Sequence, residues 1–200
     1  MTHFKRAIEL ASVGVVLLAG QVRAQEHREP SPAEICEAAG KLAAVATDPR
    51  VLSVAYLVLD RCPNSAATLA NIWATPPASA EALFQLVRKS ADMSDRRILD
   101  ATLPVVQNAS VPLATRRAAL DVVLAQFNPS VVISDAAWLD PEHSSLGSRS
   151  DYYQAPGEQP ITAADRQRII TTFHQMSISA ANSQWRRVAK RIESTLAAFP

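Results

Sequence analysis

Glycine is scarce in this 200-residue chain: there are five, and two of them, Gly14 and Gly20, lie in an N-terminal apolar run. The other three are too few for glycine-rich phosphate loops or dinucleotide-binding turns, which need several glycines at fixed offsets. They are also too few for a fold rich in β-turns. Aromatic residues make up only 6% and alanine is abundant, which favours packed helices. The composition therefore predicts an all-α protein.

No excess of either charge is present. When residues 1–24 are left out, the basic residues fall from 20 to 17 and the acidic residues from 19 to 18, a net charge of −1. A near-neutral protein has no overall field to attract nucleic acid, so we expect no nucleic-acid partner. Hydrophobic residues make up 48% and charged residues 20%, as in folded globular proteins. We therefore expect residues 25–200 to form a single domain.

Residues 1–24 have the pattern of a secretory signal peptide. A basic start precedes an apolar run over residues 7–20, and Val22 and Ala24 occupy the −3 and −1 positions of a cleavage site. A run of about 14 residues is too short to span ~30 Å of hydrocarbon. An uncleaved anchor or a buried core helix is the alternative. We expect cleavage after Ala24, no transmembrane segment after processing, and a location in the bacterial periplasm or outside the cell.

Only two cysteines, Cys36 and Cys62, are present, and export would place them where a disulfide persists. Helices are predicted over residues 32–46 and 49–61, joined by a turn at Asp48. In the sequence, Asp48 lies nearly midway between the two cysteines. Two antiparallel helices would therefore bring both cysteines to the same end, about 3 Å apart along the axis. We expect a Cys36–Cys62 disulfide, worth about 3.5 kcal/mol, with two free thiols as the alternative.

Capping residues and apolar stripes predict the helices that follow. Ser79 and Ser94 are expected to cap the fourth and fifth helices, and the sixth begins at Pro112. Pro104 lies inside the fifth helix and predicts a kink or an early stop. In the sixth helix, Arg116 and Arg117 fall outside the apolar stripe. We interpret them as structural residues that could pair with Asp92, Asp95 or Asp121.

The predicted helices form three hairpins that repeat with a period of roughly 31 to 32 positions. The clearest unit, residues 95–127, contains DRRILDATLPVV from residue 95 and VPLATRRAAL from residue 111. This unit resembles a HEAT or armadillo-like repeat, in which a proline or aspartate turn precedes a second helix with arginine, small residues and leucine. Residues 33–91 resemble it more weakly. The resemblance implies an α-solenoid of stacked antiparallel hairpins, whose concave surface binds a protein or peptide.

Residues 128–160 interrupt the helical pattern with four prolines and two glycines. They predict one long loop insertion, which could contain a short helix near residues 133–138, and loops of this length are usually functional or disordered. Residues 161–199 then predict a C-terminal helical pair: Thr162 caps the first helix and the second runs over residues 179–198.

The densest group of potential metal ligands or acid–base groups lies within the acidic segment 135–151: Asp140, Glu142 and His143. Oxygen donors with one imidazole suit a divalent cation, whereas a solvated turn is the competing interpretation. No Gly-x-Ser-x-Gly or other nucleophile motif is present. We expect no catalytic nucleophile and no cofactor. A metal-assisted enzyme is the alternative.

Four cations share one face of the final predicted helix: Arg186, Arg187, Lys190 and Arg191. Such a face suits an anionic lipid surface or an acidic partner, although a solvated face is the competing interpretation. The sequence therefore predicts an exported, non-catalytic scaffold that binds a protein or peptide. The alternatives are a metal-assisted enzyme and an envelope-associated protein held by the basic helix.

Overall fold

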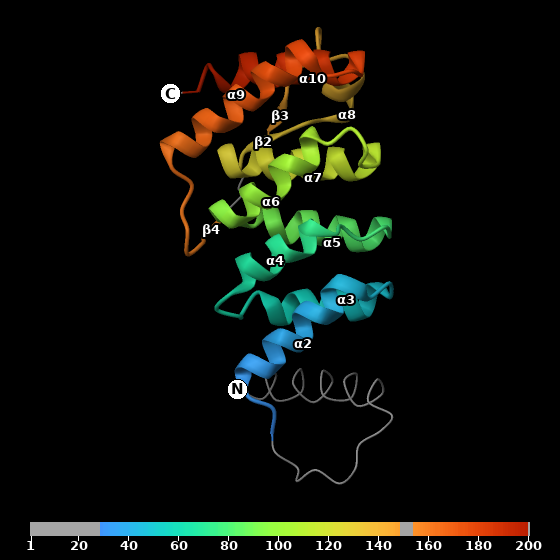
Figure 1. Ribbon diagram of the computed structural model, residues 1–200, viewed down its shortest axis with the longest axis vertical. Coiled ribbons are helices and arrows are strands. Elements are labelled where there is room, and N and C mark those ends of the chain that lie inside the picture. The colour runs from blue at the N-terminus through green and yellow to red at the C-terminus, as the bar shows by residue number, and fades with distance from the viewer. Residues whose placement is uncertain (1–28, 149–153, 200) are drawn as a thin grey trace. The chain divides into compact units, whose positions relative to one another are not determined.

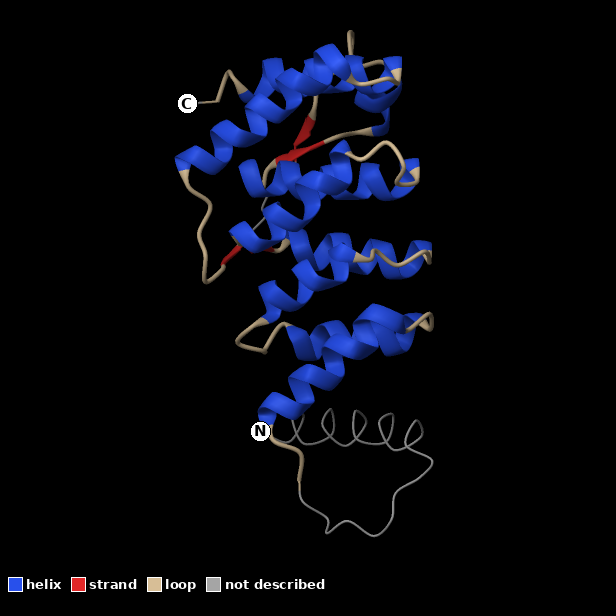
Figure 2. Cartoon of the chain, in the orientation of Figure 1, coloured by secondary structure: helices blue, strands red, loops and turns tan. Residues whose placement is uncertain are grey.

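The computed structural model describes residues 29–148 and 154–199 (Figures 1 and 2). The predicted signal peptide, residues 1–24, lies outside the described residues. Helices dominate the described chain and its four strands have two residues each, which confirms the all-α prediction. The chain divides into two compact units, with the boundary between Ser65 and Ala66. The single domain expected from the sequence stays a prediction.

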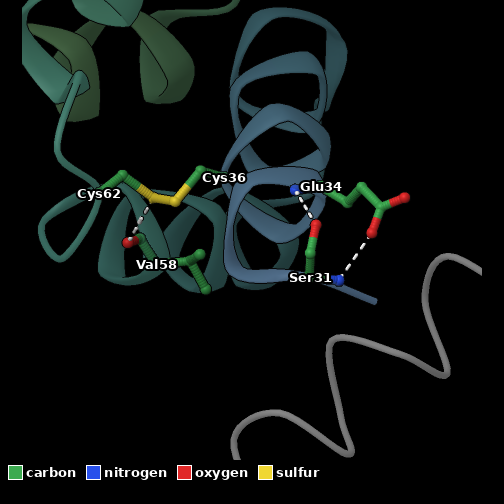
Figure 3. Close-up of a disulfide and its surroundings, with 5 residues drawn as sticks. All are labelled: Ser31, Glu34, Cys36, Val58 and Cys62. Carbon is green, nitrogen blue, oxygen red and sulfur yellow. Dashed lines mark hydrogen bonds between the residues drawn. A yellow bond between two sulfur atoms is a disulfide. The ribbon is translucent and has the colours of Figure 1, made fainter. Parts of the chain in front are cut away.

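The first unit is a helical hairpin of α2 (Pro32–Val45) and α3 (Pro49–Leu59). Ser31 begins α2 with a capping box, since its hydroxyl accepts from the N–H of Glu34 and the Glu34 carboxylate accepts from the N–H of Ser31 (Figure 3). The carboxylate of Asp48 caps α3 by accepting from the N–H of Arg50. Each cap satisfies backbone N–H groups that a helix start leaves without partners.

The predicted disulfide is confirmed: Cys36 and Cys62 are bonded, with their Cα atoms 5.7 Å apart. Figure 3 shows the bond joining α2 to the residues just after α3. The Sγ of Cys62 also lies 3.3 Å from the carbonyl oxygen of Val58. This is a contact only, because an oxidised sulfur carries no proton to donate. The bond closes the open end of the hairpin, as the helix lengths predicted.

The second unit contains the remaining helices, and Figure 1 shows them in chain order. They are α4 (Ser65–Ala74), α5 (Ala80–Ala91), α6 (Arg96–Gln107), α7 (Leu113–Phe127), α8 (Asp135–Leu139), α9 (Ala163–Ser179) and α10 (Ser183–Leu196). The pairs α6–α7 and α9–α10 each pack together, and α7 also contacts α5 and α9. Because neighbours surround it, α7 is buried continuously from Val122 to Phe127.

Two small strand pairs hold the long segment between α7 and α9. The parallel pair joins β1 (Met93–Ser94) to β4 (Ala155–Pro156), and the antiparallel pair joins β2 (Val131–Val132) to β3 (Gly147–Ser148). The short helix expected near residues 133–138 is present as α8, and the described part of residues 128–160 also contains the strands β2, β3 and β4. Its backbone is hydrogen-bonded to residues 92–96, from the residue after α5 to the first residue of α6.

Two predicted helix starts were wrong, and one of the two effects expected of Pro104 is absent. Ser94 does not cap α6, because it lies in β1 and the carboxylate of Asp95 takes that role. The early stop that Pro104 predicted does not occur, because α6 continues to Gln107. The other outcome, a kink at Pro104, stays a prediction. The last helix begins after Asn182, whose side chain accepts from the N–H of Trp185, so α10 starts later than the expected residue 179. Within the described residues, no helix is long and apolar enough to cross a membrane.

Candidate functional site

Asp95 is the centre of a buried polar network. It lies in residues 92–97, which run from the end of α5 into the first turn of α6 and which we name the junction. Its side chain is 0% exposed. Its Oδ1 accepts from the backbone N–H of Arg97 over 2.9 Å, and its own N–H donates to Oε1 of Gln126 on α7 over 3.0 Å. The amide of Gln126 in turn donates to the carbonyls of Ser90 and Met93. Asp95 and Gln126 thus fix the junction against α7.

The carboxylate of Asp95 is paired with the guanidinium of Arg97. Nε of Arg97 donates to Oδ1 over 2.9 Å and Nη2 to Oδ2 over 2.8 Å. Burial acts to raise the pKa of Asp95, but hydrogen bonds from the Arg97 side chain and from the N–H groups of Gln159 and Arg97 outweigh it and lower that pKa. Hydrogen bonding to Asp95 correspondingly raises the pKa of Arg97. Both groups are therefore charged at neutral pH, and Asp95 is unsuited to donate a proton.

A segment far away in sequence crosses this junction. We name residues 154–160 the strap. The N–H groups of Ala155 and Gly157 donate to the carbonyls of Asp92 and Ser94 over 2.9 and 2.7 Å. In the other direction, the N–H of Arg96 donates to the carbonyl of Gln159 over 2.7 Å. The backbone of the junction and the backbone of the strap therefore satisfy each other.

Side chains of the junction add two contacts to the strap. Oδ2 of Asp95 accepts from the N–H of Gln159 over 3.1 Å, and Nη2 of Arg97 lies 3.0 Å from Oε2 of Glu158. Gly157 packs against Asp95 so closely that a Cβ at position 157 would lie 2.5 Å from Asp95 Cβ and 2.6 Å from the Ser94 carbonyl oxygen. Only glycine fits there without moving the backbone.

A second cluster alternates arginine and tryptophan between α7, α8 and α10. The guanidinium carbon of Arg116 lies 4.4 Å from the centre of the Trp185 ring, and that of Arg117 lies 5.1 Å from the centre of the Trp138 ring. The two tryptophan rings meet edge to face at 5.1 Å. Stacking of this kind combines dispersion with cation–π attraction. The cluster joins three helices of the second unit.

Arg116 differs from the structural ion pair expected from the sequence: it is buried, with 7% exposed, although it lies outside the predicted apolar stripe. Its Nε donates to the carbonyl oxygen of Val106 near the end of α6 over 3.0 Å. No carboxylate among the described residues pairs with it. Burial alone lowers its pKa. The ring of Trp185 thus takes the place that an acidic side chain usually has beside a buried arginine.

The four predicted cations of α10 differ in their surroundings. Arg187 and Lys190 are exposed, whereas Arg186 and Arg191 are half-buried. Nη1 of Arg186 donates to the carbonyl of Ala180 over 2.6 Å, and Arg187 donates to the side chain of Gln184. Within the described residues none of the four has a carboxylate partner, although Arg97, Arg117 and Arg168 each do. This helix therefore carries uncompensated positive charge.

The described residues of the acidic segment, 135–148, do not gather into a cluster. His143 lies 2.9 Å from Asp140, both exposed, and the hydrogen bond and negative charge of Asp140 raise the pKa of His143. Asp135 instead pairs with Arg117. Across residues 29–148 and 154–199, no group of three or more histidine, cysteine, aspartate or glutamate side chains could hold a metal ion. The metal-assisted enzyme stays a prediction, and no cluster of metal ligands among the described residues supports it.

The junction was not found from the sequence. The signals were present, since Gly157 is one of only three glycines after the apolar N-terminal run, and Asp95 precedes an apolar helix. The sequence did not indicate that these two residues, which are far apart in the chain, are in contact. Gln126 gave no signal, because a glutamine in a helix is usually exposed. No family model, curated protein or solved structure matches the chain.

Proposed function

We propose that this chain is an exported, non-catalytic helical-repeat protein whose stacked hairpins bind a protein or peptide partner. The observation that carries the proposal is the position of α7, which packs against α6 of its own hairpin and also against α5 before it and α9 after it. Contacts between consecutive hairpins are the defining feature of a helical solenoid. The Cys36–Cys62 disulfide supports export, since such bonds persist in oxidising compartments.

The binding surface is proposed to lie on α5 and α7, two helices that pack against each other. Phe84 of α5 is 60% exposed and Leu113 of α7 is 53% exposed. Exposed large apolar side chains are costly in water and are common anchors in protein interfaces. Neither residue is needed for the core, so substitutions there test binding separately from folding.

The test is capture of partners from envelope extract by the mature chain with its disulfide intact. We expect Phe84→Ser to reduce capture of a specific partner about tenfold or more, as for a central apolar anchor. Ile178→Ser is the matched control, because Ile178 is 68% exposed on α9 and outside the proposed surface. Equal capture by both variants would refute this surface. A radius of gyration of about 15.7 Å, expected for a compact chain of about 176 residues, would refute the stack.

The uncompensated charge of α10 favours a second candidate function, attachment to an anionic membrane surface. A basic residue near such a surface contributes about 1 kcal/mol. We expect the double variant Arg187→Gln, Lys190→Gln to bind vesicles containing phosphatidylglycerol about thirtyfold more weakly. The control is Arg168→Gln, which removes a cation that is paired with Asp100. Binding that is insensitive to salt, or equal for neutral vesicles, would contradict this function.

A further inference from the structure

The carboxylate of Asp95 and the backbone next to it are held by contacts that do not involve the strap. Gln126 holds this backbone with three hydrogen bonds, two donated to Ser90 and Met93 and one accepted from Asp95. Arg97 holds the carboxylate of Asp95 with two more. The groups that meet the strap are therefore positioned in advance, which lowers the entropic cost of binding a segment there.

The strap, in contrast, gives nothing to the hydrophobic core. None of its seven residues is buried: Gln154, Ala155 and Gly157 are half-buried, and the other four are exposed. Its attachment consists of backbone hydrogen bonds, the Glu158–Arg97 ion pair and the two bonds that the Gln154 amide donates to Ala91 and Ala125. A segment held in this way can be replaced by another of similar sequence without opening the core.

The contacts of the strap also define what the junction selects. Addition of a strand through backbone hydrogen bonds accepts many sequences, and side-chain contacts supply the specificity. Here the position against Asp95 requires glycine, as the Cβ distances to Asp95 and Ser94 show. The next residue faces the guanidinium of Arg97, which favours a carboxylate. The selected pattern is an extended segment with glycine followed by an acidic residue.

We propose that the junction is a docking site for an extended Gly-acidic segment of a partner protein, and that the strap occupies this site within the chain. The inference rests on the proposed scaffold function and names the peptide class that the scaffold recognises. The strap acts as an internal competitor, because a tethered segment has a high effective concentration at its site. A partner segment binds only when it displaces the strap.

The test uses a fluorescein-labelled peptide with the strap sequence, Gln-Ala-Pro-Gly-Glu-Gln-Pro, and the full mature chain. Gly157→Ala should release the strap by steric clash with Asp95 and Ser94. We expect this variant to bind the peptide about tenfold or more tightly than the wild type, whose site is occupied. Pro156→Ala is the matched control. Pro156 is exposed and has no N–H to donate, so this variant should bind as weakly as the wild type.

Peptide variants test the two selected positions. Alanine in place of the peptide's glycine should abolish binding, and glutamine in place of its glutamate should weaken binding about threefold, as expected for one exposed ion pair. A folded Gly157→Ala chain that fails to bind the peptide overturns the proposal. Dimers of that variant without peptide binding also overturn it and assign the site to a second copy.

A measurement on the wild type covers the case in which Gly157→Ala does not fold. With excess unlabelled peptide, the amide of Gly157 should exchange its hydrogen faster, because the strap has left the carbonyl of Ser94. The amide of Arg96 should stay protected, because the peptide supplies a carbonyl in place of that of Gln159. Unchanged exchange at Gly157 refutes the proposal. Since only a synthetic peptide is used, failure here and failure of the α5–α7 surface are distinguishable.

Discussion

At the scale of single residues, the second unit depends on a few polar side chains placed where apolar residues are usual. Asp95, Gln126 and Arg116 are all at least nine-tenths buried. The carboxylate of Asp95 is satisfied by the Arg97 guanidinium and backbone N–H groups, and the amide of Gln126 is satisfied by backbone groups of the junction and α5. Arg116 relies on one carbonyl and one tryptophan ring. The two arrangements predict different responses to substitution.

The lowered pKa of Asp95 predicts a loss of stability in acid. An aspartate in the unfolded chain has a pKa of about 3.9. Because the folded-state value is lower, the ionised carboxylate stabilises the fold; this contribution is present above about pH 4 and is lost as pH falls through the folded-state pKa. We expect the free energy of unfolding in urea to fall as pH decreases from about 5 to about 2, and to fall less in Asp95→Asn.

Asp100→Asn is the control for that measurement, because Asp100 is also ion-paired but is exposed. The pKa of Asp165 is also lowered, mainly through hydrogen bonding to Thr162. Part of the acid sensitivity should therefore remain in Asp95→Asn. If Asp95→Asn has the same pH profile as the wild type, the assignment to Asp95 is wrong.

We expect the volume of the Arg116 side chain to contribute more to the stability of the fold than its charge. With no carboxylate partner among the described residues, Arg116→Met removes a buried charge and keeps the packing on Trp185. We expect a change in unfolding free energy within about 1 kcal/mol. Arg116→Ala opens a cavity beside the ring and should cost about 2–3 kcal/mol. Equal losses in both variants, measured by urea titration, would show that the charge itself stabilises the fold.

At the scale of elements, the start of each helix followed mostly from local chemistry. The predicted caps at Ser79 and Thr162 are confirmed, since each side chain accepts from the backbone N–H three residues later. Such caps need no distant residue, so a single sequence reveals them. The cap of α6 was misassigned because β1 extends through Ser94, and β1 exists only through its pairing with β4. A distant strand thus decided where a helix begins.

The proline inside α6 predicts a stabilising substitution. Pro104 is exposed and lies well inside a continuous helix, where it removes the hydrogen bond to the carbonyl of Asp100. Pro104→Ala restores that bond and relieves the clash of the ring, partly offset by greater freedom of the unfolded chain. We expect a gain of about 1–2 kcal/mol in thermal or urea unfolding. A loss of stability would mean that Pro104 has a packing role that its exposure does not show.

At the scale of the whole molecule, the division into two compact units determines how the disulfide acts. Cys36 and Cys62 both lie in the first unit. In the chain-entropy model, the bond stabilises that hairpin by about 3.5 kcal/mol, because it restricts the conformations of the unfolded chain. Its loss should therefore affect one unit much more than the other.

We expect Cys36→Ser, Cys62→Ser to increase hydrogen exchange in α2 and α3 and to leave the buried amides of α7 almost unchanged. Local unfolding of a cooperative unit gives this pattern. Hydrogen exchange followed by mass spectrometry, with the wild type under non-reducing conditions as reference, makes the comparison. Equal acceleration in α7 would show that the two units unfold together.

The sequence by itself determined the helical class, most helix starts and the cysteine pairing, because these depend on composition, on capping by near neighbours and on the lengths of two adjacent helices. Only the tertiary structure decided the junction and the position of Arg116. Gly157 meets Asp95 and Trp185 covers Arg116 although long stretches of chain separate the members of each pair. The local pattern of each residue is the same with or without its distant partner. A buried polar residue is recognisable only when the group that satisfies it is in place.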